Sequence, residues 1–254
     1  MKKNFRLISR LDIKNDFLVK GIQMEGWKKV GCPNNFAERY YENGVDELLV
    51  MDIVASLYRK KVNENFLNFL KDKIYIPITF GGGIRSVEDA TKILSKGADK
   101  ICINTAAVHN PNLIDEIAKK FGTQAISVAI DISLSQSGEY FIATEFGRNL
   151  HDKDINEWIE EIQERGAGEI IITSIQRDGT LIGFDIDFFE KLYKNIYVPF
   201  IIGGGFGEIN QLSDLFNFKY IDGVLVGTAF HQNELSVKDC KNFIFENGYE
   251  TRKI

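Results

Sequence analysis

Short apolar runs alternate with amphipathic stretches along most of this chain. Several of the amphipathic stretches have the spacing of helices that bury one face. The apolar runs are nearly continuous, which is typical of parallel strands covered on both faces. The pattern predicts an α/β fold with eight strands, at residues 7–13, 47–53, 76–80, 100–104, 125–131, 169–174, 200–202 and 223–228.

Helices are predicted between these strands wherever apolar residues recur at helical spacing. Ser86 and Asp89 resemble a helix N-cap that directly follows a run of three glycines. A short run at residues 140–144 is a candidate extra strand in a long loop after the fifth strand. The predicted helices cover residues 34–43, 62–70, 86–96, 155–165 and 236–246.

The two halves of the chain repeat each other. The triple glycine at 81–83 returns at 203–205, and residues 44–50 match residues 166–172 at the same offset. Eight strands alternating with helices over about 250 residues fit one (β/α)8 TIM barrel. We therefore expect a single barrel over 1–254, built from half-barrels of about 1–122 and 123–254. A doubly wound open sheet is the alternative, but it does not explain the repeat.

Composition narrows the possible partners. The 254 residues are 44% hydrophobic and 26% charged, with a formal net charge of −5, so no basic surface for nucleic acid is expected. No apolar run is long enough for a membrane span. Three cysteines without paired spacing favour reduced thiols in a cytoplasmic protein. The isolated His109, His151 and His231 give no metal-ligand spacing, so we expect no metal.

Glycines and small polar residues follow several predicted strands at the end where barrels keep their chemistry. Glycine lets an anion approach backbone N–H groups, so two glycine-rich rims predict a substrate with two phosphates. The alternative is that these glycines only form tight turns. The residues concerned are Gly82, Gly83, Asn104, Thr105, Asp178, Gly179, Gly204, Gly205, Gly227 and Thr228.

Two aspartates end strands that face each other in an eight-stranded ring. Asp12 ends the first strand and Asp131 the fifth. Two carboxylates on either side of a substrate can divide the general acid and general base roles if one is kept protonated. Taken alone, Asp12 is equally well explained as a turn or helix-cap residue.

Four charged residues begin strands at the opposite end of the barrel. Arg6, Glu47, Lys100 and Glu169 stand near the start of the first, second, fourth and sixth strands. Charges directed into a barrel must pair with one another. The ring they predict is either functional or a stabilising feature of that end.

Short motifs at strand ends and turns are spread over essentially the whole chain. They are Leu11-Asp-Ile-Lys, Val19-Lys-Gly, Asp46-Glu-Leu, Phe80-Gly-Gly-Gly-Ile-Arg-Ser-Val-Glu-Asp-Ala, Gly97-Ala-Asp-Lys, Ile103-Asn-Thr-Ala-Ala-Val, Ala129-Ile-Asp, Gly166-Ala-Gly-Glu and Arg177-Asp-Gly-Thr. Through these motifs the chain resembles the cyclase subunit of imidazole glycerol phosphate synthase.

The resemblance implies an ammonia-dependent cyclase and lyase of histidine biosynthesis, without a cofactor. The substrate would be a phosphoribulosyl formimino carboxamide ribonucleotide, and the products imidazole glycerol phosphate and aminoimidazole carboxamide ribonucleotide. Asp12 and Asp131 would be the acid and base. The implied substrate-binding residues are Lys20, on a mobile loop, and Gly82, Gly83, Asn104, Thr105, Thr173, Asp178, Gly179, Gly204, Gly205, Gly227 and Thr228.

The resemblance also implies a partner. A glutaminase subunit docked on the N-terminal face of the barrel would produce ammonia, which would travel along the barrel axis. Asp99 would contact this partner, and the ring of charged residues would be the gate for ammonia; it consists of Arg6, Glu47, Lys100 and Glu169.

Several residues depart from the family pattern. Arg10 replaces a usual cysteine, Ile132-Ser133 replaces Ala-Lys, Gln176 replaces an acid and Gly203 replaces serine. The region from Met24 to residue 58 looks more like a related branch, which passes ammonia to an amidotransferase that amidinates a nucleotide sugar in surface-polysaccharide biosynthesis. Both functions remain open, as do a non-catalytic ammonia-conducting partner and a sugar-phosphate isomerase.

Overall fold

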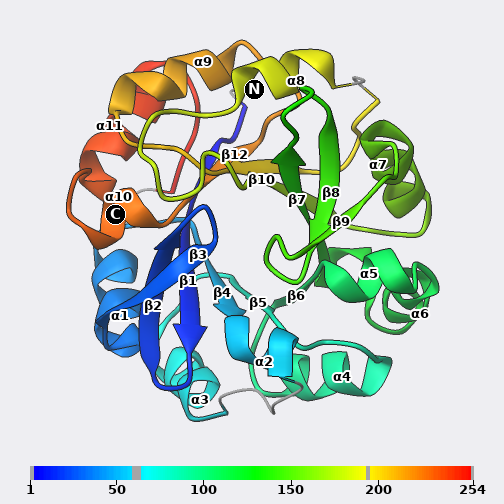
Figure 1. The fold of residues 1–254 in the computed structure, drawn as a ribbon. Coiled ribbons are helices and arrows are strands. Elements are labelled where there is room, and N and C mark those ends of the chain that lie inside the picture. The colour runs from blue at the N-terminus through cyan, green and yellow to red at the C-terminus, as the bar shows by residue number, and fades with distance from the viewer. Residues whose placement is uncertain (1–2, 59–63, 193–194, 253–254) are drawn as a thin grey trace.

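The computed structural model describes residues 3–58, 64–192 and 195–252. Eight parallel strands form a closed ring at its centre (Figure 1). The last ring strand pairs with the first, which closes the barrel. This confirms the predicted (β/α)8 fold. In order around the ring the strands are β1 (Arg6–Lys14), β4 (Glu47–Asp52), β5 (Ile78–Gly81), β6 (Lys100–Ile103), β7 (Ile126–Leu134), β10 (Glu169–Ser174), β11 (Phe200–Gly203) and β12 (Gly223–Val226).

Helices surround the ring (Figure 1). All five predicted helices are present, although residues 62–63 of the second lie outside the described part of the chain. The Ser86 hydroxyl accepts a hydrogen bond from the backbone N–H of Asp89, which confirms the predicted N-cap. The helices are α1 (Pro33–Glu42), α2 (Ile53–Tyr58), α3 (Glu64–Lys73), α4 (Val87–Ser95), α5 (Thr105–His109), α6 (Asn112–Phe121), α7 (Ile155–Glu164), α8 (Ile186–Lys191), α9 (Leu212–Phe216), α10 (Thr228–His231) and α11 (Val237–Glu246), with short 3₁₀ turns η1 (Thr123–Ala125) and η2 (Ile209–Gln211).

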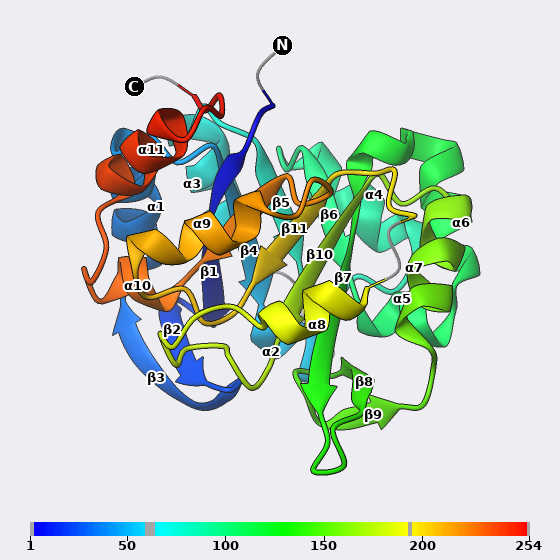
Figure 2. The same cartoon turned by 90° about the horizontal axis from the view of Figure 1, so that it is seen from above.

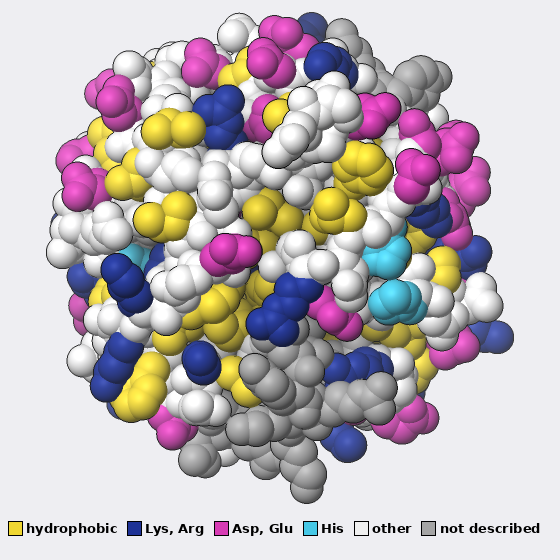
Figure 3. All heavy atoms as spheres, viewed as in Figure 1, with side chains coloured by type: hydrophobic (Ala, Val, Ile, Leu, Met, Phe, Trp, Pro, Cys, Tyr) yellow, Lys and Arg dark blue, Asp and Glu magenta, His cyan; other side chains and the backbone are white. Residues whose placement is uncertain are grey.

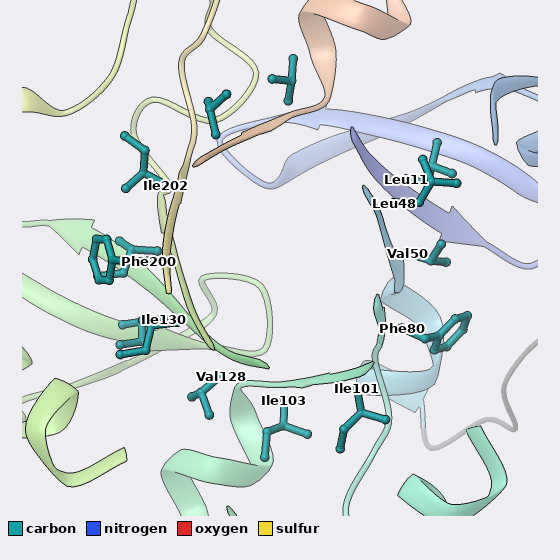
Figure 4. Packing of buried hydrophobic residues seen from close by; sticks show 14 of the residues in the cluster. Leu11, Leu48, Val50, Phe80, Ile101, Ile103, Val128, Ile130, Phe200 and Ile202 are labelled. Carbon is teal, nitrogen blue, oxygen red and sulfur yellow. The ribbon is translucent and has the colours of Figure 1, made fainter. Parts of the chain in front are cut away.

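The ring separates the two largest clusters of buried apolar residues. Because successive strand residues point to opposite faces, every ring strand except β5 supplies apolar residues to both clusters. The larger cluster lies between the ring and the helices, and Figure 4 shows side chains such as Leu48, Phe80 and Ile130 directed outward from the ring. The smaller cluster fills the inside of the barrel and consists of Ile8, Leu49, Cys102, Ala129, Ile171, Ile201 and Leu225.

Two antiparallel excursions extend from one end of the barrel. One is formed by β2 (Phe17–Ile22) and β3 (Glu25–Gly31) after β1, and the other by β8 (Tyr140–Thr144) and β9 (Asn149–His151) after β7. The sequence predicted β8 but not β2 and β3. Both excursions lie at the end opposite to the chain termini (Figure 2). Within the described ranges, no helix has the length and hydropathy needed to cross a membrane.

Candidate active site

The strand ends on the side of the two excursions form a polar mouth. Figure 3 shows acidic and basic side chains gathered at the centre of this face among hydrophobic ones. Asp12 on β1 and Asp131 on β7 stand four strands apart in the eight-stranded ring, and therefore on opposite sides of it. The structure thus gives the two aspartates the opposed placement that the sequence predicted.

Asp12 is enclosed by cations. Its side chain is fully buried, and the Arg10 Nε donates to its Oδ1 across 2.8 Å. The Lys20 ammonium lies 3.5 Å from the other carboxylate oxygen. Burial works to raise the pKa of Asp12, but Arg10 and Lys20 outweigh it and hold the pKa below its usual value. Asp12 is therefore ionised at neutral pH.

Asp131 has a different environment. Its Oδ2 accepts a hydrogen bond of 2.8 Å from the Asn104 amide, and no salt bridge reaches it from the described residues. Burial, opposed by Arg10 and reinforced by the negative charge of Asp178, raises the pKa of Asp131 to about 6. The pKa values of the two carboxyl groups are thus shifted in opposite directions.

A cavity of about 410 Å³ opens beside Asp131. It has the size of a small-molecule site and mixes apolar walls with a few polar groups. Asp12 does not line it, whereas Arg10, which donates a hydrogen bond to Asp12, does. The predicted site residues that do line it are Gly82, Gly83, Asn104, Thr105, Asp131 and Thr173.

A second, much smaller cavity lies across the mouth. Its volume is about 20 Å³, enough for about one water molecule, and Lys20 and Asp178 both line it. The Lys20 Nζ donates to both carboxylate oxygens of Asp178, at 2.8 and 2.7 Å. A phosphate could enter only if this ion pair separated. The predicted residues lining the cavity are Lys20, Thr173, Asp178, Gly179, Gly204, Gly205, Gly227 and Thr228.

The glycines at both rims are required by the backbone itself. Gly82 has φ +101°, and a Cβ there would lie 2.2 Å from the Asp52 carbonyl oxygen. Gly204 and Gly205 also have positive φ, and added Cβ atoms would lie 2.6 and 2.0 Å from backbone oxygens. Tight turns therefore explain these glycines without a ligand. The buried Thr228 hydroxyl has no hydrogen-bond partner in the part of the chain that the structure describes, and it is the more direct indication that the small cavity can bind a polar group.

The β2–β3 hairpin is anchored to the loop that carries Asp178, a contact that the sequence analysis missed. The backbone N–H of Gln23 donates to the Asp178 carbonyl across 2.8 Å. On the other side of the same loop, the Gln176 side-chain amide donates to Ser133 Oγ across 3.0 Å. The departures at 133 and 176 therefore contact each other.

The four predicted charges at the other end form a closed ring of alternating sign. Lys100 Nζ lies 2.6 Å from Glu47 and 2.9 Å from Glu169, and Arg6 pairs with the same two carboxylates at 3.1 and 2.5 Å. Burial opposes ionisation of Glu169, but Lys100 and Arg6 hold its pKa below the usual range. The predicted partner residue Asp99 lies at this end with its carboxylate accepting from Ile78 N–H.

The histidines do not gather into a ligand set. No cluster that could hold a metal ion occurs within residues 3–58, 64–192 and 195–252. His109 and His151 pack edge to face at 5.6 Å, and His231 Nδ1 shares a hydrogen bond of 2.6 Å with the Tyr40 hydroxyl. All three cysteines are free thiols.

Comparisons with known proteins agree with this geometry. Residues 6–236 match the profile of the family described as histidine biosynthesis protein. Imidazole glycerol phosphate synthase subunit HisF of Pyrococcus furiosus is 40% identical over 97% of this chain and 98% of its own length.

Two further relatives carry the same name. The subunit from Streptococcus mutans is 37% identical over 97% of this chain and 98% of its own length, and that from Legionella pneumophila is 42% identical over 83% and 99%. The chain therefore belongs to the histidine biosynthesis protein family, among the HisF subunits of imidazole glycerol phosphate synthase.

Proposed function

We propose that this chain is the cyclase subunit of imidazole glycerol phosphate synthase. It combines ammonia with a phosphoribulosyl formimino carboxamide ribonucleotide to give imidazole glycerol phosphate, aminoimidazole carboxamide ribonucleotide and water. The observation that carries this function is the pair of buried carboxyl groups on opposite strands of one mouth, of which Asp12 is ionised and Asp131 has a raised pKa. Such a pair can accept and donate protons in one reaction.

The two rims of the mouth hold the two phosphates of the substrate. The rim with Gly82, Gly83 and Thr105 holds one phosphate beside the large cavity. The rim with Gly204, Gly205 and Thr228 holds the other, with Lys20 turning from Asp178 toward the anion. Backbone N–H groups and a lysine are suitable anion donors. The middle of the substrate then lies over Arg10 and Thr173, which line both cavities.

Ammonia reaches this mouth from the other end of the barrel. A glutaminase docks on the N-terminal face, where exposed Asp99 and Tyr75 line a shallow depression. The names of the relatives support such a partner, because each is called a subunit. The ring formed by Arg6, Glu47, Lys100 and Glu169 closes the axis, so it must open for ammonia to pass.

The relatives do not favour the sugar-amidation alternative, since those compared are named for the histidine pathway.

The two halves of the barrel also support an origin by duplication. Both β1 and β7 have nine residues, and each leads into an antiparallel excursion at the mouth. We propose half-barrels of about 1–122 and 123–254 on that basis.

An ammonium-dependent assay with purified protein tests the function. The wild type is expected to convert the ribonucleotide to imidazole glycerol phosphate with ammonium salt as the nitrogen source, without the glutaminase. Asp131→Asn removes the proton donor and is expected to lower kcat at least about a hundredfold. Its circular dichroism should stay that of the wild type. No turnover by a folded wild type at saturating ammonium would refute the proposal.

A further inference from the structure

Arg10 is a buried cation at the centre of the candidate active site. It stands two residues before Asp12 and two after Ile8 on β1, so all three side chains point into the barrel. Only 6% of Arg10 is exposed, yet it lines both the large and the small cavity. Its side chain therefore lies in the wall between the two rims.

Three carboxylates surround Arg10, but its side chain forms a hydrogen bond with one of them only. Burial works to lower the pKa of Arg10, and attraction by Asp12, Asp178 and Asp131 outweighs it, so the guanidinium stays charged. Its hydrogen bond goes to Asp12 alone among these three in the described structure. The geometry thus ties the fixed positive charge to one member of the aspartate pair.

The other neighbours increase this asymmetry. Lys20 is 3.5 Å from Asp12 while it pairs with Asp178, whereas Asp131 receives a neutral amide donor from Asn104. His231 on α10 also faces Asp12, but burial and the nearby Lys20 lower its pKa to about 3, so it is neutral at working pH. Asp12 therefore faces two cations.

We propose that Arg10 is a positioning residue that keeps Asp12 ionised as the proton acceptor and thereby leaves Asp131 as the proton donor. This assignment rests on the proposed function. Ammonia displaces the ketone oxygen of the substrate, which leaves as water with two of the ammonia protons. When the nitrogen then closes the ring, Asp12 gains its remaining proton and Asp131 gives one proton to the departing nitrogen. The pair returns to its starting state when Asp12 releases a proton to solvent and Asp131 takes one up.

The role of Arg10 is tested first by titration, which needs no turnover. The carboxyl carbons of ¹³C-labelled aspartate are followed by NMR against pH, and Asp12→Asn and Asp131→Asn identify the two signals. In the wild type, Asp12 is expected to titrate at lower pH than Asp131. In Arg10→Gln, the titration of Asp12 is expected to move to higher pH by more than that of Asp131, because Asp12 loses the attraction of the Arg10 charge and the hydrogen bond from its Nε.

Two further variants separate charge from packing. Arg10→Lys keeps the charge and is expected to restore part of the change, whereas Arg10→Met, which fills similar space without charge, is expected to behave like Arg10→Gln. Arg165→Gln is the matched control, since the Arg165 guanidinium also pairs with two carboxylates, Glu161 and Asp115, but on the outer surface. It is expected to leave the titration of Asp12 unchanged.

The pH profile of kcat/KM with ammonium supplies the second measurement. Loss of Arg10 is expected to move the acid limb to higher pH, so that activity on that limb falls by roughly tenfold or more. A purely structural role would lower activity equally at all pH values and would overturn the proposal.

Different results would overturn the role of Arg10 and the proposed function. An unchanged Asp12 titration in both Arg10→Gln and Arg10→Met, with an active wild type, overturns the role of Arg10 and leaves the proposed function standing. An inactive wild type in which Arg10 still controls the Asp12 titration overturns the proposed function, and with it the role of Arg10 in turnover.

Discussion

Replacing Lys100 by methionine isolates the electrostatic part of the charged ring. Lys100 bridges Glu47 and Glu169, whose side chains are only 3% and 4% exposed. Methionine keeps most of the side-chain volume but leaves Arg6 as the one cation between two buried carboxylates. Hydroxyl donors remain, since Thr79 donates to Glu47 and Ser127 to Glu169.

The size of the effect follows from burial. Removing one partner of a fully buried ion pair costs about 3–5 kcal/mol. The Lys100 and Arg6 side chains are 14% and 27% exposed, so solvent screens part of the interaction. With the two hydroxyl donors retained, we expect the free energy of unfolding at pH 7 to fall by about 2–3 kcal/mol. A second change, Glu169→Gln, is expected to recover part of this loss by removing the excess negative charge, because Arg6 then faces one carboxylate only.

The loss of stability in Lys100→Met is expected to depend on pH, in a direction that follows from the pKa shift of Glu169. The pKa of Glu169 is lowered in the fold, so its stabilising contribution is present above its ordinary value of 4.5 and is lost as pH falls through the folded value. Without Lys100 that contribution shrinks. The difference between variant and wild type should therefore be largest near neutral pH and become smaller below about pH 4.5.

Urea unfolding followed by circular dichroism measures this difference at pH 7 and at pH 4. Arg165→Met is the control, because Arg165 also joins two carboxylates but on the surface, where we expect a loss of at most about 1 kcal/mol. A loss below about 1 kcal/mol for Lys100→Met at pH 7, or one that grows on acidification, would show that the ring is not held by these charges.

Three further predictions concern the mouth and its surroundings. Gly204→Ala is expected to lower the free energy of unfolding by at least about 2 kcal/mol more than Gly138→Ala in urea unfolding, because both have positive φ but only Gly204 has a backbone oxygen 2.6 Å from the added Cβ. Lys20→Met is expected to raise KM for the bisphosphate at least about tenfold in the ammonium assay. The change removes the cation that pairs with Asp178 and that is proposed to bind a substrate phosphate. An unchanged KM would exclude contact between Lys20 and the phosphate. His231, whose pKa falls from 6.5 to about 3, stabilises the fold above pH 6.5 and loses this contribution as pH falls; His231→Gln should flatten the dependence of stability on pH between 6.5 and 5.

The barrel could be predicted because its strands have a local signal in the sequence, a run of apolar residues. β4 and β10 are continuous apolar runs, buried along almost their whole length. The β2–β3 hairpin was missed because most of β3 is exposed and carries no apolar pattern. Helix α6 does have apolar residues at helical spacing, Leu113, Ile114 and Ile117, so this signal was present and was not used.

The site was predicted as a set of strand-end residues, but not as a set of contacts. The position of Asp12 and Asp131 follows from the order of the strands. The Lys20–Asp178 pair joins residues 158 positions apart, and nothing local in the sequence reports such a pairing. Arg10 could have been found, since a period of two along β1 places it on the same face as Asp12.

The departures from the family pattern differ in their electrostatic consequences. At positions 133 and 176 a lysine and an acid are replaced by Ser133 and Gln176, which form a hydrogen bond with each other. One charge of each sign is lost, so these two replacements together leave the net charge of the mouth unchanged. Arg10 replaces an uncharged thiol and adds a cation whose hydrogen bond goes to Asp12. The charge that Arg10 adds is thus not balanced by another of these replacements, and we expect it to lower the proton affinity of Asp12.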